Sequence, residues 1–126
     1  MDRLDTAAVS RLFGILAQLT EEETSVYLPT VKSGMAYFER LFLRDYADEA
    51  EKQLSEYACA CKVFFDYTVL KAAIPKTYST QSGGIFAKVS DDAAVKNAAA
   101  LMRRAMAALP EGLISDDGFV FEGVAG

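Results

Sequence analysis

Few side chains in this sequence are of types that perform chemistry, and their spacing does not bring them together. The chain has no histidine, which removes the commonest general base and the commonest metal ligand. Its two cysteines, Cys59 and Cys61, lie two positions apart, and such residues point to different sides of a helix. They cannot easily bridge each other or share a metal, so we interpret them as reduced, small core residues. We therefore expect no cofactor, no metal site and no catalytic cysteine.

Catalysis by acidic side chains is the possibility that remains. An enzyme that used carboxylates such as Glu39, Glu56 or Asp66 would need two of them to converge in a pocket with shifted pKa values. The acidic run at 21–23 is consecutive, and consecutive residues diverge around a helix, so we interpret it as a solvated first turn. The expectation is that the chain is not an enzyme.

Two other clusters have simpler interpretations. A phosphate-binding Walker loop needs a Gly-Lys-Ser/Thr at fixed spacing after a buried strand, and Gly83-Gly84 lacks both features. We interpret this pair as a turn. Arg103 and Arg104, with Lys96 before them, form a basic cluster. A solvated helix face explains this cluster, and contact with an acidic partner is the alternative.

Composition limits the class of protein. The chain has 126 residues, which is the size of a single domain, 1–126. Its formal net charge is −5, whereas proteins that bind phosphate backbones need a cationic surface. We therefore expect no sequence-specific nucleic-acid binding. Because no apolar run approaches about 20 residues and the N-terminus lacks a basic region before an apolar run, we expect neither a membrane span nor a signal peptide.

The elements that position these residues are organised around a central helix, predicted over 48–74. Two apolar faces with helical spacing indicate that this helix is buried among others. The first face consists of Leu54, Tyr57, Cys61, Phe64, Phe65, Thr68 and Ala72, and the second of Val63, Tyr67, Leu70 and Ile74. Lys62, Asp66 and Lys71 fall on a narrow strip that faces solvent. Pro75 ends the helix because proline disfavours helix in the residue before it.

Three further helices are predicted around it. The first, over 2–19, has an apolar stripe that consists of Leu4, Ala8, Leu12, Ile15 and Leu19, widened by Phe13 and Leu16. The second, over 21–43, begins with a Thr20–Glu23 capping box, and Pro29 predicts a kink or break near Tyr27–Leu28. Asp45 or Asp48 caps the central helix. The last, over 91–109, is rich in alanine and is ended by Pro110 and Gly112.

Two segments do not fit a helical body. Residues 76–89 have no helical period, so we predict a protruding loop or short β-hairpin near 77–89, with its turn at the two glycines. Residues 113–126 form an extended tail. Aromatic side chains in such segments are costly to leave in water, so they either fill the core or dock on another chain. The candidate contact residues are Tyr78, Gly83, Gly84, Ile85, Phe86, Phe119, Val120 and Phe121. The predicted class is all-α, a small bundle of four main helices around 48–74.

This order of parts resembles the small helical head–tail connector (adaptor, head-completion) proteins of tailed bacteriophages and prophages. The resemblance covers about residues 20–124. The matching parts, in order, are an aliphatic-Pro-x-aliphatic run at 28–31 that continues to Ala-aromatic-aromatic-acidic at 36–39, an Ala- and aromatic-rich helix at 57–73, a Ser/Thr-Gly-rich excursion at 79–89, a Ser-Asp-Asp cap at 90–92 and an Asp-Asp-Gly-Phe-x-Phe ending at 116–121.

The resemblance implies a non-enzymatic ring component of the virion. Its partners would be further copies of itself and the portal and tail proteins. Its location would be the cytoplasm of the bacterial host during assembly and then the head–tail junction of the virion. Two alternatives remain open, a small helical regulatory or protein-interaction module of bacterial origin and a carboxylate-using enzyme. The sequence predicts no membrane partner.

Overall fold

The structure is a computed structural model that describes residues 4–73 and 80–115, and for residues 80–92 it describes the backbone only. Within these ranges the chain forms five α-helices and no β-strand, which confirms the predicted all-α class. The helices are α1 (Thr6–Ala17), α2 (Glu21–Val26), α3 (Leu28–Glu39), α4 (Glu49–Ala73) and α5 (Thr80–Ala107).

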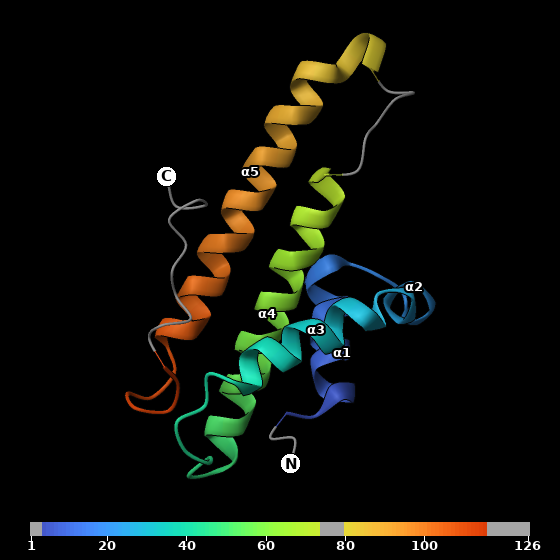
Figure 1. The fold of residues 1–126 in the computed structure, drawn as a ribbon. Coiled ribbons are helices and arrows are strands. Elements are labelled where there is room, and N and C mark those ends of the chain that lie inside the picture. The colour runs from blue at the N-terminus through green and yellow to red at the C-terminus, as the bar shows by residue number, and fades with distance from the viewer. Residues whose placement is uncertain (1–3, 74–79, 116–126) are drawn as a thin grey trace.

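Helix α4 is the centre of the fold, as predicted for residues 48–74. In Figure 1, α5 lies along one side of α4, and the three shorter helices lie on the other side. Helices α1 and α3 both pack on α4. Helix α2 contacts α1 and α3 and lies farther from α4. The buried core runs through this contact zone. Phe13, Val31, Phe38, Val63 and Met102 are its largest fully buried apolar side chains together with Leu113 and Val9.

Local sequence signals set the helix starts. The Asp5 carboxylate accepts a hydrogen bond from the Ala7 amide at 3.0 Å and caps α1. Thr20 and Glu23 form the predicted capping box of α2, with distances of 2.9 and 3.1 Å. Asp48 accepts from the Glu51 amide at 2.9 Å, so it is the cap of α4 that the sequence left open between two aspartates. Each cap satisfies helical N–H groups that otherwise have no partner.

The predicted break at Pro29 is also present. Helix α2 ends at Val26 and α3 begins at Leu28, which places the proline in the first turn of α3. A proline is tolerated in a first turn because its missing N–H has no helical acceptor there. The long helix predicted over 21–43 is therefore two helices.

Backbone hydrogen bonds join the segment that follows α5 to the segment that follows α3. The Leu43 amide donates to the Leu113 carbonyl at 2.8 Å, and the Ser115 amide donates to the Leu41 carbonyl at 2.7 Å. This short antiparallel bridge buries Leu113 and Ile114 against the core. The beginning of the predicted tail is thus part of the body, and residues 116–126 lie outside the described part of the chain.

The hairpin predicted near 77–89 is wrong over the residues described there. Residues 80–89 are helical, and α5 begins at Thr80 rather than at 91. A two-stranded hairpin without a third strand is marginal in water, whereas extending an existing helix adds a hydrogen bond for each residue fixed. Each glycine at 83 and 84 costs the helix roughly 1 kcal/mol relative to alanine. Residues 77–79 lie outside the described part of the chain.

The two apolar faces predicted for α4 are only partly buried. Leu54, Tyr57 and Leu70 are 40%, 37% and 45% exposed, while Ser55 and Glu56 are buried. Leu54 and Tyr57 lie at the same level of α4 as Ser55 and Glu56, so at that level the buried face differs from the predicted one. Leu70 lies near the C-terminal end of α4, which has 25 residues and is about 38 Å long, whereas α1 and α3 have 12 residues each and are about 18 Å long. The shorter helices surround only the middle of α4, so burial depends on the level along the helix as well as on the face.

Candidate functional site

The residues predicted to make subunit contacts are mostly outside the described part of the chain. This holds for Tyr78, for residues 119–121 and for the side chains of Ile85 and Phe86. Gly83 and Gly84 lie in the backbone of α5 and do not form the predicted turn. Their role as a contact surface stays a prediction.

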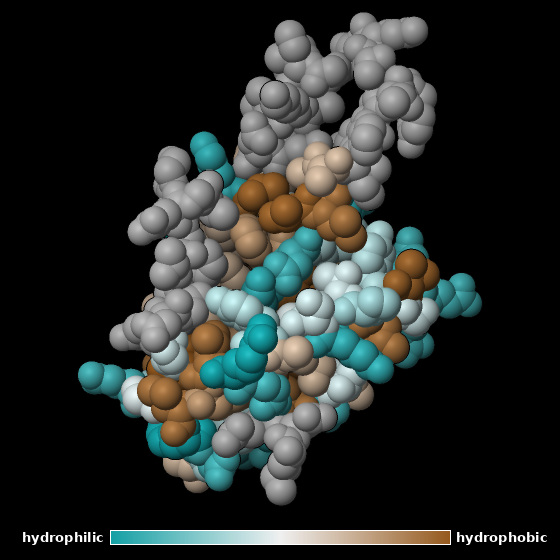
Figure 2. Space-filling model, viewed as in Figure 1, coloured by the Kyte–Doolittle hydropathy of each residue, from teal (hydrophilic) through white to brown (hydrophobic). Residues whose placement is uncertain are grey.

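An apolar surface that the structure does describe lies at the C-terminal end of α4. Val69 and Leu70 are 40% and 45% exposed there, whereas residues 58–61 in the middle of the same helix are buried. Figure 2 shows apolar surface over the upper parts of α4 and α5, next to the grey atoms. In the sequence this surface comes shortly before residues 74–79, which lie outside the described part of the chain.

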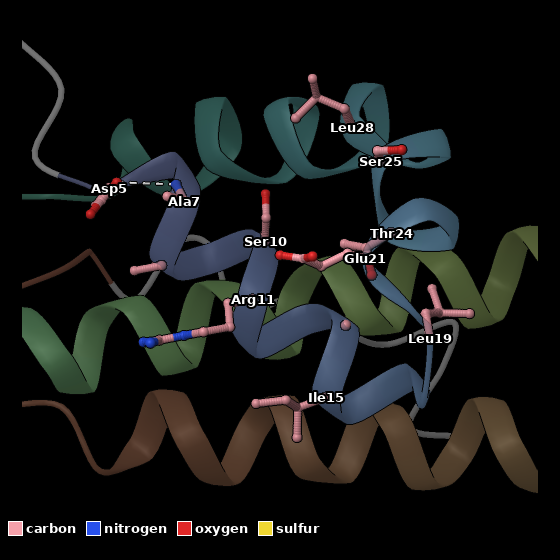
Figure 3. Close-up of a pocket in the computed structure, with 12 residues that line it drawn as sticks. Asp5, Ala7, Ser10, Arg11, Ile15, Leu19, Glu21, Thr24, Ser25 and Leu28 are labelled. Atoms are coloured by element: carbon pink, nitrogen blue, oxygen red, sulfur yellow. Dashed lines mark hydrogen bonds between the residues drawn. The ribbon is translucent and has the colours of Figure 1, made fainter.

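A groove lies on the outer side of α1. Helix α1 forms one wall, and residues that follow it, among them Leu19, Thr24 and Leu28, form the other (Figure 3). Its volume is about 720 Å³, which is within the range of protein binding pockets. The floor is tight because Gly14 is buried against α2, and a Cβ atom on it would lie 2.6 Å from the Thr24 hydroxyl oxygen.

The groove combines apolar walls with charged edges. Ala7, Ala8 and Ile15 line it from α1 and Leu28 from α3. Its charged residues are Asp5, Arg11 and Glu21, and all three are exposed. No buried polar side chain among the described residues that line it points to a small polar ligand.

Sequence reasoning missed this groove because it placed Ile15 on the buried stripe of α1. Ile15 is 67% exposed, whereas Val9 and Phe13 are fully buried and Leu12 and Leu16 are half-buried. The spacing of the apolar residues could have shown that Ile15 is exposed. Val9 and Phe13 are four residues apart and form one stripe with Leu12 and Leu16, and Ile15 lies outside this stripe.

The three carboxylates considered for catalysis make different contacts. Glu39 accepts a hydrogen bond from the Leu4 amide at 2.8 Å and so holds the start of the chain against α3. Asp66 forms an ion pair with Lys62 at 2.8 Å. Glu56 and Asp66 are ten residues apart on one helix, which is about 15 Å along its axis. Asp66 therefore does not pair with Glu56 as an acid and base would.

A buried polar group of side chains lies between α4 and the loop before it. The Tyr46 hydroxyl, the Ser55 hydroxyl and Oε2 of Glu56 are buried, and the Ser55 side chain is close enough to the Tyr46 hydroxyl to affect its pKa. Burial raises the pKa of Tyr46, and the charges of Glu39 and Glu56 raise it further. The tyrosine therefore stays protonated at neutral pH and is a hydrogen-bond donor rather than a base.

Both cysteines are buried and free, and their burial was predicted. Burial raises the pKa of Cys61 to about 11 and also raises the pKa of Cys59. Thiolates are the reactive form of cysteine, so neither thiol is activated at neutral pH. Over the described residues, no group of His, Cys, Asp or Glu side chains has the arrangement of a metal site.

Charge is distributed unevenly between the two sides of the molecule. Helix α2 carries Glu21, Glu22 and Glu23, all exposed, in its first turn. On α5, Lys96 and Arg104 are exposed and Arg103 is half-buried, and the helix has no acidic residue between Ala93 and Ala107. Lys96 and Arg104 are thus exposed on the single chain, and both interpretations of the basic cluster, a solvated helix face and contact with an acidic partner, stay predictions.

Comparisons of the chain with protein families, with curated proteins and with solved structures find no match in any of the three. In the described part of the chain, no helix has both the length and the apolar character needed to cross a bilayer. The function therefore has to be argued from the residues and surfaces described above.

Proposed function

We propose that this chain is a non-enzymatic structural component of a phage or prophage virion, similar to the connector that joins the portal of the head to the tail. The order of its parts supports this: a helix with Pro29 in its first turn, a central helix rich in alanine and aromatic residues, and an alanine-rich helix after it. Its partners are further copies of itself and the portal and tail proteins. It acts in the host cytoplasm during assembly and then at the head–tail junction.

The exposed apolar end of α4 is the observation that carries the proposal. Val69 and Leu70 lead directly into the segment that holds Tyr78, Ile85 and Phe86. Less than half of each aliphatic side chain is exposed, so covering one of them contributes about 1 kcal/mol of binding free energy. An aromatic side chain that is fully removed from water contributes about 1.5–3 kcal/mol. A neighbouring subunit or the portal that covers this end of the molecule gains enough to hold a specific contact.

Deletion of the gene in the phage or prophage that encodes it tests the proposal. We expect DNA-filled heads without tails, seen by electron microscopy, because the connector completes the head before the tail attaches. Supplying the Val69→Ser/Leu70→Ser chain should fail to restore tailed particles. Leu43→Ser is the matched control, because Leu43 is 64% exposed and lies away from this end, in the loop after α3. Normal infectious particles after deletion would overturn the proposal and favour the alternative, a small helical regulatory or interaction module.

A second experiment addresses the contact residues themselves. The double change Phe86→Ser/Phe121→Ser should leave the helical circular-dichroism signal and the melting of the monomer nearly unchanged. It should weaken self-association or attachment to the portal. If the double change unfolds the monomer, these aromatic side chains belong to its own core and the contact assignment is wrong.

A further inference from the structure

The groove on α1 and the outer surface of α5 carry opposite charges. The groove has apolar walls, and its acidic residues are Asp5 and Glu21. Glu22 and Glu23, which are also exposed, follow Glu21 in the sequence. Arg11 is the single basic side chain among the residues that line it, so this region has a clear acidic excess. Opposite charges at the edge of a contact steer association and fix its register.

The outer surface of α5 is the surface that faces away from α4. Because α5 packs mainly against α4, this side of the helix has no covering helix among the described residues. Its exposed residues are small or basic: Ala93, Ala94, Lys96, Asn97, Arg104, Ala107 and Ala108. Alanines let a helix backbone approach a surface closely, and the basic side chains extend beyond them toward acidic neighbours.

We propose that the groove on α1 and α2 receives the outer surface of α5 from a second copy of this chain. This inference rests on the proposed function, in which copies of the chain assemble, and it adds the two surfaces that meet. In Figure 1, α5 and the three N-terminal helices lie on opposite sides of α4. A contact between two different surfaces on opposite sides joins copies head to tail, and such a contact closes into a ring or continues as a filament.

Charge reversal on each surface tests the contact, with self-association of the full chain measured by sedimentation velocity at low salt. Lys96→Glu/Arg104→Glu on α5 and Glu21→Lys/Glu22→Lys on α2 should each weaken self-association at least about tenfold. The four changes in one chain should restore it, because the charges again oppose each other. Association of the unchanged protein should weaken as salt is raised.

Mixing the two charge-reversed chains is the more specific measurement. Each chain keeps one original surface, so an equal mixture should form a one-to-one dimer through the original pair, and the two reversed surfaces, whose charges again oppose each other, should extend this dimer as in the unchanged chain. A contact that used the same surface twice would be unaffected by the reversal on the other surface. Arg40→Glu and Glu49→Lys are matched controls, because both residues are exposed and lie outside the two surfaces. Circular dichroism confirms that each variant is folded.

Three results would overturn the inference: an unchanged chain that stays monomeric at low salt up to about 1 mM, self-association that survives both reversals, or a mixture that stays monomeric. If one of these occurs and gene deletion still gives tailless heads, the proposed function stands and these surfaces are wrong. If the charge swap behaves as expected and deletion leaves normal particles, the self-contact stands and the proposed function is wrong.

Discussion

Replacing Gly34 by alanine tests the close contact between α3 and α4. An added Cβ atom would lie 2.7 Å from Cγ2 of Val63, well inside van der Waals contact. Val63 is fully buried, and a β-branched side chain in a helix has one strongly preferred rotamer, so its methyl group cannot turn away cheaply. Overpacking of this kind costs about 1–3 kcal/mol, and the better helix propensity of alanine returns about 1 kcal/mol. We expect Gly34→Ala to lower the free energy of unfolding by about 1 kcal/mol.

The same change should have the opposite sign when Val63 is shortened. Val63→Ala removes two buried methyl groups and should by itself cost about 1–3 kcal/mol. In that background the methyl group at position 34 enters vacated space, so the helix-propensity gain is unopposed. Gly34→Ala should then raise the free energy of unfolding, giving a coupling between the two sites of about 1–2 kcal/mol.

Urea unfolding of the four chains, followed by circular dichroism, measures this coupling. Ser33→Ala is the control, because Ser33 is exposed next to Gly34 and its change should stay within about 0.5 kcal/mol. Equal effects of Gly34→Ala in both backgrounds would mean that the α3–α4 contact is looser than the structure has it.

Three further predictions concern helix ends and buried groups. Thr20→Ala removes the capping hydrogen bond to the Glu23 amide and should lower the free energy of unfolding by about 0.5–2 kcal/mol in urea titrations; no loss would mean that α2 is frayed. Gly112 has φ of +84° and open space around its Cβ position, so Gly112→Ala should cost about 1–2 kcal/mol from backbone strain alone and Gly112→Asn less, as thermal melting can measure. The raised pKa values of both thiols stabilise the fold below pH 9, where an unfolded thiol is also protonated, and this stability is lost as pH rises from 9 through about 11. Replacing both Cys59 and Cys61 by alanine should flatten this part of the pH profile, and an unchanged profile would assign it to other groups.

The sequence predicted the features that depend on neighbouring residues. The capping box at Thr20–Glu23, the break before Pro29 and the central helix are all confirmed. Each follows from a few adjacent residues, whose backbone geometry and hydrogen bonds are fixed locally. The prediction of a hairpin near 77–89 was wrong. It relied on local composition, with two glycines and several β-branched residues, and gave too little weight to the cost of an unsupported two-stranded sheet.

The candidate site could not be read from the sequence in the same way. The groove is formed by residues of α1, α2 and α3 that are up to 23 positions apart, from Asp5 to Leu28, and it exists because Gly14 allows α2 to approach α1. Likewise, the polar side chains Ser55 and Glu56 are buried by neighbours that sequence spacing does not reveal.

Composition and spacing by themselves determined that this protein is built of helices, where most of those helices begin and end, and which helix is central. These properties depend on propensity, capping and apolar periodicity, which act over a few residues. Tertiary structure alone decided which apolar residues stay in contact with solvent. Helices of about 18 Å cannot cover one of about 38 Å along its whole length, so Val69 and Leu70 near the C-terminal end of α4 stay exposed.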